Sequence, residues 1–126
     1  MKRIEVLSAT ILALLSLVSS SALAEAEDIH IEDFEAKDYG GWKADGEAFG
    51  AGPAGGTLPD QKKVAGFKGK RLATSFHGGD ETTGTLTSPE FVVRRDYINF
   101  LVCGGGYEGE TFLNLLVDGR AARTAT

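Results

Sequence analysis

The distribution of glycine is the feature that most restricts what this chain can fold into. All 17 glycines lie after Ala24, between short runs of β-branched and aromatic residues. Average proteins hold only ~7% glycine, and a glycine inside a helix costs about 1 kcal/mol while it permits tight turns. No stretch after Ala24 longer than about ten residues keeps a helical period. The pattern predicts an all-β fold.

Candidate strands follow one another at the spacing typical of a β-sandwich or barrel. The predicted strands cover residues 29–34, 64–67, 71–76, 84–87, 90–93, 97–102, 111–117 and 120–125. Between the first two, the glycine-rich residues 38–60 predict short strands joined by structured loops. Asp118-Gly119 predicts a two-residue hairpin turn. We expect a β-sandwich domain over residues 25–126 that is incomplete at its C-terminus, because the last expected strand is the last run present.

The N-terminus has the three parts of a secretory signal peptide. Lys2 and Arg3 precede an apolar run at residues 6–18, and small residues follow up to Ala24. A membrane-spanning helix takes about 20 apolar residues, which is more than this run contains. The sequence predicts a signal-peptide helix at residues 1–24, cleavage after Ala24, and a secreted or periplasmic protein with no membrane association after cleavage.

The net charge and the cysteine content exclude one class of binding partner and one source of stability. The formal net charge is −5 and shows no basic cluster, which argues against nucleic acid as a partner. Cys103 is the only cysteine, so no intrachain disulfide can form. We expect Cys103 to be a buried thiol.

Four strings of the sequence, in order, resemble one known module. They are residues 34–59, 75–91, 97–106 and 112–126, which begin FEAKDYGGW, SFHGGDETTG, YINFLVCGGG and FLNLLVDGR. Together they resemble the N-terminal β-sandwich module that precedes the catalytic domain in levanase-like and β-fructosidase-like enzymes of glycoside hydrolase family 32. The resemblance implies a jelly-roll accessory domain, carbohydrate-associated, on a secreted fructan- or sucrose-cleaving enzyme.

The sequence departs from that family in two respects. Cys103 stands where the family carries the first of four glycines. The family's catalytic strings, Asn-Asp-Pro, Arg-Asp-Pro and Glu-Cys, are absent; Arg95-Asp96-Tyr97 is the nearest approach to the second. Any hydrolase activity is therefore expected in a catalytic domain outside this chain. We interpret the chain itself as a truncated accessory module of the parent enzyme.

Sugar binding needs aromatic rings that stack on sugar faces, with polar groups beside them for the hydroxyls. Tyr39, Trp42 and Tyr107 lie in glycine-rich segments, as do His77 and Asp80, and these five are the candidate carbohydrate-binding residues. Two alternatives stay open: Trp42 as a core residue of the sandwich and His77 as an ordinary turn residue. Tyr107, between a glycine and a glutamate, is the one most expected to be exposed.

The carboxylates do not identify a catalytic pair. Retaining glycoside hydrolysis needs two carboxyl groups about 5 Å apart, and pairs such as Glu108 and Glu110 have the pattern of a solvated surface. Calcium is a candidate ligand for the acidic segment that holds Asp28, Glu32, Asp33 and Glu35. The alternative is a solvated acidic strand face, and no other cofactor is expected.

The leading hypothesis is a non-catalytic, carbohydrate-associated module of a levanase-like hydrolase, with a fructan as the expected glycan partner. A free-standing carbohydrate-binding or adhesion module with no attached enzyme is the alternative. A purely structural spacer, which would bind no sugar, is a third reading.

Overall fold

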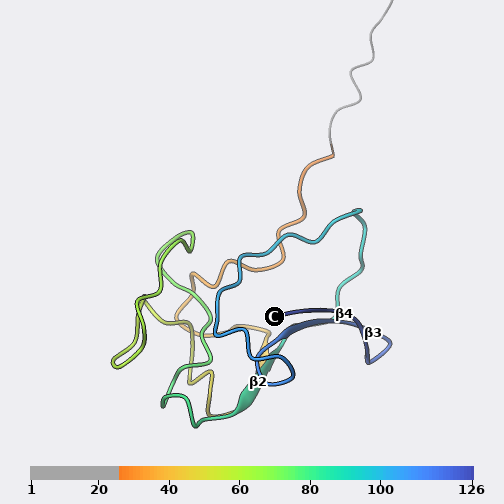
Figure 1. The fold of residues 1–126 in the computed structure, drawn as a ribbon. Coiled ribbons are helices and arrows are strands. Elements are labelled where there is room, and N and C mark those ends of the chain that lie inside the picture. Colours follow the sequence, from red (N-terminus) through yellow and green to blue (C-terminus); the bar gives the residue numbers. More distant parts are fainter. Residues whose placement is uncertain (1–25) are drawn as a thin grey trace, which may run out of the picture.

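The computed structural model describes residues 26–126 (Figure 1). The predicted signal peptide at residues 1–24 lies outside this part and stays a prediction. Residues 26–126 form four short strands and no helix, which confirms the all-β prediction. Because the described residues contain no helix, they contain none long and apolar enough to cross a membrane.

The first sheet pairs β1 (Lys43–Gly46) with β2 (Gly84–Thr87) in antiparallel register. Gly46 lies opposite Gly84 at the end of this ladder. A Cβ at Gly84 would lie 2.6 Å from the carbonyl oxygen of Asp45, so the two backbones approach too closely for any other residue. Beyond the strands, the amides of Glu47 and Ala48 both donate to the carbonyl oxygen of Thr83, at 3.0 and 3.3 Å. The pairing carries the chain directly to Ala48, which is buried.

The second sheet is the predicted hairpin of β3 (Leu113–Val117) and β4 (Arg120–Ala125). Asp118 and Gly119 form its turn with φ values of 50° and 73°. Two positive φ values in a two-residue loop are the mark of a type I′ turn, which suits the twist of the paired strands. The register shifts between Leu115 and Leu116, so the hairpin contains a β-bulge. At the end of β4 the chain reaches its C-terminus (Figure 1).

Five predicted strands are wrong in this structure. No strand forms at residues 29–34, 64–67, 71–76, 90–93 or 97–102, although Leu72 makes one isolated bridge to Ala54. A segment with high strand propensity forms a strand only where it can pair with the edge of a neighbouring strand. Within residues 26–126, the run at 97–102 makes no backbone hydrogen bond to another segment. Residues 97–102 therefore have side chains suited to a strand but lack, within the described part of the chain, the backbone hydrogen bonds to a neighbouring strand that would make them one.

The core is small and lies in the loops around β1. Its buried apolar side chains are Tyr39, Ala48 and Ala54. Phe34 packs edge-on against Tyr39 and Trp42, with ring centroids 6.1 and 5.1 Å apart. These edge-to-face contacts are the favoured geometry for aromatic pairs. These aromatic rings therefore supply much of the packing around the small core.

The acidic segment is held by its own carboxylates. Glu32 Oε1 accepts hydrogen bonds from the amides of Asp33 and Phe34, at 3.0 and 2.8 Å. Glu35 Oε1 reaches much farther along the chain and accepts from the amides of Lys70 and Arg71, at 2.8 and 3.0 Å. This contact joins the first described segment to the turn at residues 68–71.

Much of the apolar surface in the second half of the chain is exposed. The large exposed apolar residues after position 90 are Phe91, Val92, Val93, Tyr97, Phe100, Leu101, Val102, Tyr107, Phe112, Leu113, Leu116 and Val117. Cys103 lies in the same region and is exposed as a free thiol. The expectation of a buried Cys103 is therefore wrong, because the run that carries it has no covering layer among the described residues.

Candidate functional site

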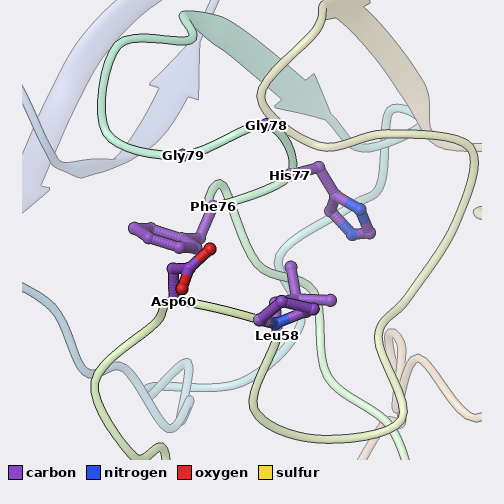
Figure 2. A pocket seen from close by; sticks show the side chains of 7 residues that line it. Leu58, Asp60, Phe76, His77, Gly78 and Gly79 are labelled. Atoms are coloured by element: carbon purple, nitrogen blue, oxygen red, sulfur yellow. The ribbon is translucent and has the colours of Figure 1, made fainter.

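Two turns that are distant in the sequence enclose a pocket of about 400 Å³ (Figure 2). One turn contributes residues 58–60 and the other contributes residues 76–79. In Figure 2 the carboxylate of Asp60 extends toward the ring of Phe76, and His77 lies on the opposite side above Leu58. The pocket thus combines an aromatic ring, a carboxylate and an imidazole in one hollow.

The first turn is fixed by Gln61. The amide of Gln61 donates to the carbonyl oxygen of Leu58 at 3.2 Å, while Gln61 Oε1 accepts from the amide of Leu58 at 2.9 Å. Its side-chain nitrogen donates to Thr74 Oγ1 at 3.2 Å, which ties the turn to the segment that leads into the second turn. Pro59 and Asp60 are the central residues, and Asp60 has a φ of 62°. This arrangement is that of a type II turn, with proline second and positive φ third.

The second turn is fixed by its backbone and by Thr82. The amide of Gly79 donates to the carbonyl oxygen of Phe76 at 3.0 Å, and Gly78 in the third position has a φ of 86°. The hydroxyl oxygen of Thr82 lies 2.9 Å from the carbonyl oxygens of both His77 and Gly79, and it shares its proton between them. This turn therefore repeats the positive φ of the first turn, here with the expected glycine.

His77 is anchored to the core side of the pocket. Its amide donates to the carbonyl oxygen of Ala48 at 3.0 Å. Its imidazole packs on Gly50, where an added Cβ would lie 2.7 Å from His77 Cγ. Nε2 is buried and has no hydrogen-bond partner among the described residues. Because it has no partner in this part of the chain, this nitrogen retains unused hydrogen-bonding capacity. Leaving a buried polar atom unpaired lowers the stability of the fold by about 1–3 kcal/mol.

Tyr39 and Trp42, two of the predicted sugar platforms, lie against the aromatic core. Tyr39 is 7% exposed and donates its hydroxyl proton to the carbonyl oxygen of Phe49 at 2.9 Å. Burial raises the pKa of this hydroxyl above its ordinary value of 10.0. Trp42 is half-buried against Phe34. Sugar binding by these two residues stays a prediction.

The other three predicted residues divide between the pocket and the surface. His77 lines the pocket, and Asp80 is exposed in the same loop, directly after the lining residues. Tyr107 is 64% exposed, as expected. It begins a turn in which its own carbonyl oxygen accepts hydrogen bonds from the amides of Glu110 and Thr111. His77 and Asp80 thus share one loop, although only His77 lines the pocket, and Tyr107 lies in a separate turn.

Asp60 and Phe76 are pocket residues that the sequence pattern does not single out. Phe76 was assigned to the end of a strand, and Asp60 was treated as part of a glycine-rich loop. The one available signal was Pro59-Asp60, a dipeptide suited to the centre of a turn. Nothing in the sequence indicated that this turn would face residues 76–79.

Three of the four calcium candidates accept hydrogen bonds from backbone amides in this structure. Glu32 and Glu35 accept the amide hydrogen bonds described above, and Asp33 Oδ1 accepts from the amide of Glu35 at 3.0 Å. Across residues 26–126, no three His, Cys, Asp or Glu side chains are grouped so as to hold a metal ion. Calcium binding by Asp28, Glu32, Asp33 and Glu35 stays a prediction.

Comparison with known proteins gives one informative similarity. No family model and no solved structure matches the chain. The chain is 42% identical over 98 residues, or 75% of its length, to a protein of Aspergillus rugulosus named "Putative glycosyl hydrolase ecdE". These residues make up 14% of that protein's length. The chain is therefore related to a protein that carries the name of a glycosyl hydrolase, and it spans a small part of it.

Proposed function

We propose that this chain is a carbohydrate-associated module of a secreted, levanase-like glycoside hydrolase that cleaves fructans or sucrose. The module itself adopts a jelly-roll-like sandwich in the complete protein and performs no catalysis. The observation that carries the proposal is the 42% identity to the protein named as a glycosyl hydrolase. The ordered resemblance of residues 34–59, 75–91, 97–106 and 112–126 to the family 32 module supports the narrower assignment.

The chemistry of the described residues supports a binding role over a hydrolytic one. Hydrolysis of a glycosidic bond needs two carboxyl groups placed on either side of the scissile bond. The pocket is lined by a single carboxylate, that of Asp60. An aromatic ring and a few polar groups in one hollow are suited to holding a sugar. The proposal assigns the catalytic residues to another part of the enzyme.

The coding sequence provides the first test of the enzyme assignment. We expect the reading frame to continue beyond Thr126 into a catalytic domain that contains Asn-Asp-Pro, Arg-Asp-Pro and Glu-Cys. A frame that continues into an unrelated domain would contradict the levanase-like assignment. A frame that ends at Thr126 would favour the free-standing carbohydrate-binding module instead.

Binding and hydrolysis by the chain itself provide the second test. We expect the purified chain to bind levan or inulin in isothermal titration calorimetry and to release no reducing sugar from either. Tyr107→Ala should weaken binding about two- to tenfold if this exposed ring stacks on sugar. Tyr107→Phe is the matched control, because it keeps the exposed aromatic ring and should keep most of the affinity. Release of reducing sugar would contradict the non-catalytic role, and no heat with either polymer would contradict carbohydrate binding.

A further inference from the structure

We propose that the pocket between residues 58–60 and 76–79 binds the terminal ring of a sugar chain. This inference rests on the proposed carbohydrate association and specifies where the sugar binds. The pocket volume of about 400 Å³ lies near the lower end of the ~300–1,000 Å³ that small-molecule sites span. It suits one or two hexose rings that enter end-on. A long polymer lying across an open surface would instead need a row of aromatic platforms.

The pocket offers complementary apolar and polar groups to a sugar. The ring of Phe76 supplies an apolar wall for the C–H face of a pyranose or furanose. Asp60 is exposed, and its carboxylate makes no hydrogen bond among the described residues. An ionised carboxylate has only acceptor sites, so it can accept from two neighbouring hydroxyl groups at once. Both residues line the same pocket, and in Figure 2 the carboxylate is drawn beside the ring of Phe76.

The backbone of the second turn leaves one amide without a partner among the described residues. The amide of Gly79 is used within the turn, whereas the amide of Gly78 has no partner in the described part of the chain. Thr82 and Gln61 fix the two turns through the hydrogen bonds described above. A site that is already ordered loses less conformational entropy when a ligand binds. The two walls are therefore held in place before a sugar enters.

The first turn has an aspartate, Asp60, at a position where glycine is the more usual residue. The two turns have equivalent third positions with positive φ, at Asp60 and Gly78. Glycine is the favoured residue there, and the second turn has it. The first turn instead holds an aspartate at φ 62°, a conformation that costs a residue with a Cβ roughly 1 kcal/mol. Asp118 has a similar conformation in the β3–β4 turn, so the positive φ alone assigns no role; Asp60 differs because it lines the pocket.

The experiment measures amide chemical shifts and affinity for sucrose and for levan. In the wild-type chain we expect both sugars to shift the amide signals of Gly78 and Gly79. Asp60→Gly should weaken binding about tenfold, because a charge-assisted hydrogen bond is lost. The same change should keep the fold, because glycine accepts the positive φ that aspartate has there. Phe76→Leu, which keeps an apolar side chain without the ring, should also weaken binding.

A matched control separates the loss of the carboxylate from the effect of a new glycine. Asp118 is also an aspartate with positive φ, at 50°, but it lies in the β3–β4 turn and does not line the pocket. Asp118→Gly should therefore leave the affinity for both sugars unchanged.

The possible outcomes keep this inference distinct from the proposed function. Weaker binding in Asp60→Gly and Phe76→Leu, with Asp118→Gly unaffected, would support the pocket. Sugar binding that survives both pocket variants and falls in Tyr107→Ala would overturn the pocket and leave the carbohydrate-binding role standing. Shifts at Gly78 and Gly79 with the disaccharide sucrose but none with levan would overturn the terminal-ring assignment. No binding of either sugar by the wild-type chain would overturn both the pocket and the binding role.

Discussion

Tyr39 shows how a single residue can have the right chemistry and an unexpected position. An aromatic ring beside Gly40 and Gly41 is compatible with an exposed platform, and the same segment is also compatible with a buried turn. The structure buries the ring edge-on against Phe34 and Phe49 and satisfies its hydroxyl with a backbone carbonyl. Because water is excluded there, the neutral hydroxyl is favoured and its pKa rises.

Tyr39 should therefore make the fold sensitive to alkaline pH. Above its ordinary pKa of 10.0, the unfolded chain releases the tyrosine proton while the folded chain still holds it. The folded state then binds more protons, so the free energy of unfolding falls as pH rises through 10.0. We expect Tyr39→Phe to reduce this fall, measured by urea unfolding at pH 8 and at pH 10.5.

The control for this prediction is Tyr107→Phe, at an exposed position. It should leave the alkaline loss of stability as in the wild-type chain. The same pH dependence in Tyr39→Phe and wild type would show that the Tyr39 hydroxyl does not contribute to it.

Among the strands, those specified by local residues could be predicted from the sequence, whereas contacts between distant segments could not. The β3–β4 hairpin could be predicted because Asp118-Gly119 sets its own backbone angles and thereby its register. β2 was predicted with its observed bounds, Gly84–Thr87. β1 and the contact from Glu35 to residues 70–71 depend on segments more than 30 positions away. No local residue pattern specifies such a partner.

Glu35 is the side chain that best tests the importance of these long-range contacts. Glu35→Ala leaves the amides of Lys70 and Arg71 without their acceptor, and we expect the free energy of unfolding to fall by about 1–3 kcal/mol. Glu35→Gln, which keeps an acceptor oxygen, should cost less. The measurement is chemical denaturation followed by tryptophan fluorescence, since Trp42 is the only tryptophan.

Glu90→Ala is the control for Glu35, because Glu90 is exposed and its carboxylate makes no hydrogen bond among the described residues. It should change stability by less than about 0.5 kcal/mol. Equal effects of Glu35→Ala and Glu90→Ala would refute a stabilising role for the Glu35 contact.

For the molecule as a whole, the balance of buried and exposed apolar surface is unusual. Only three apolar side chains form the described core, whereas the runs at residues 91–93 and 97–102 expose most of their large side chains. Large apolar patches with unpaired backbone promote association with other chains. This surface is consistent with the proposal that the module belongs to a larger enzyme.

The exposed run at residues 97–102 should drive self-association of the isolated chain. We expect sedimentation velocity to show oligomers that grow with protein concentration. Leu101→Lys should reduce them, because Leu101 is 66% exposed and a charge interrupts the apolar run. The melting temperature should change little, since little packing is lost.

The control is Asn99→Lys, which adds the same charge in the same run without removing apolar surface. It should reduce association less than Leu101→Lys. A wild-type chain that stays monomeric at all concentrations would contradict the role assigned to this surface.

Properties that arise within a few residues could be predicted from the amino-acid sequence alone. Glycine spacing excluded long helices, Asp118-Gly119 specified a hairpin, and the glycine and glutamate beside Tyr107 favoured an exposed ring. Three features depend instead on long-range packing: the burial of Tyr39, the contact from Glu35 to residues 70–71, and the pocket that Asp60 and Phe76 share with His77. The physical reason is that a turn depends on the conformational preferences of its own residues, whereas the meeting of two turns depends on how the whole chain packs between them.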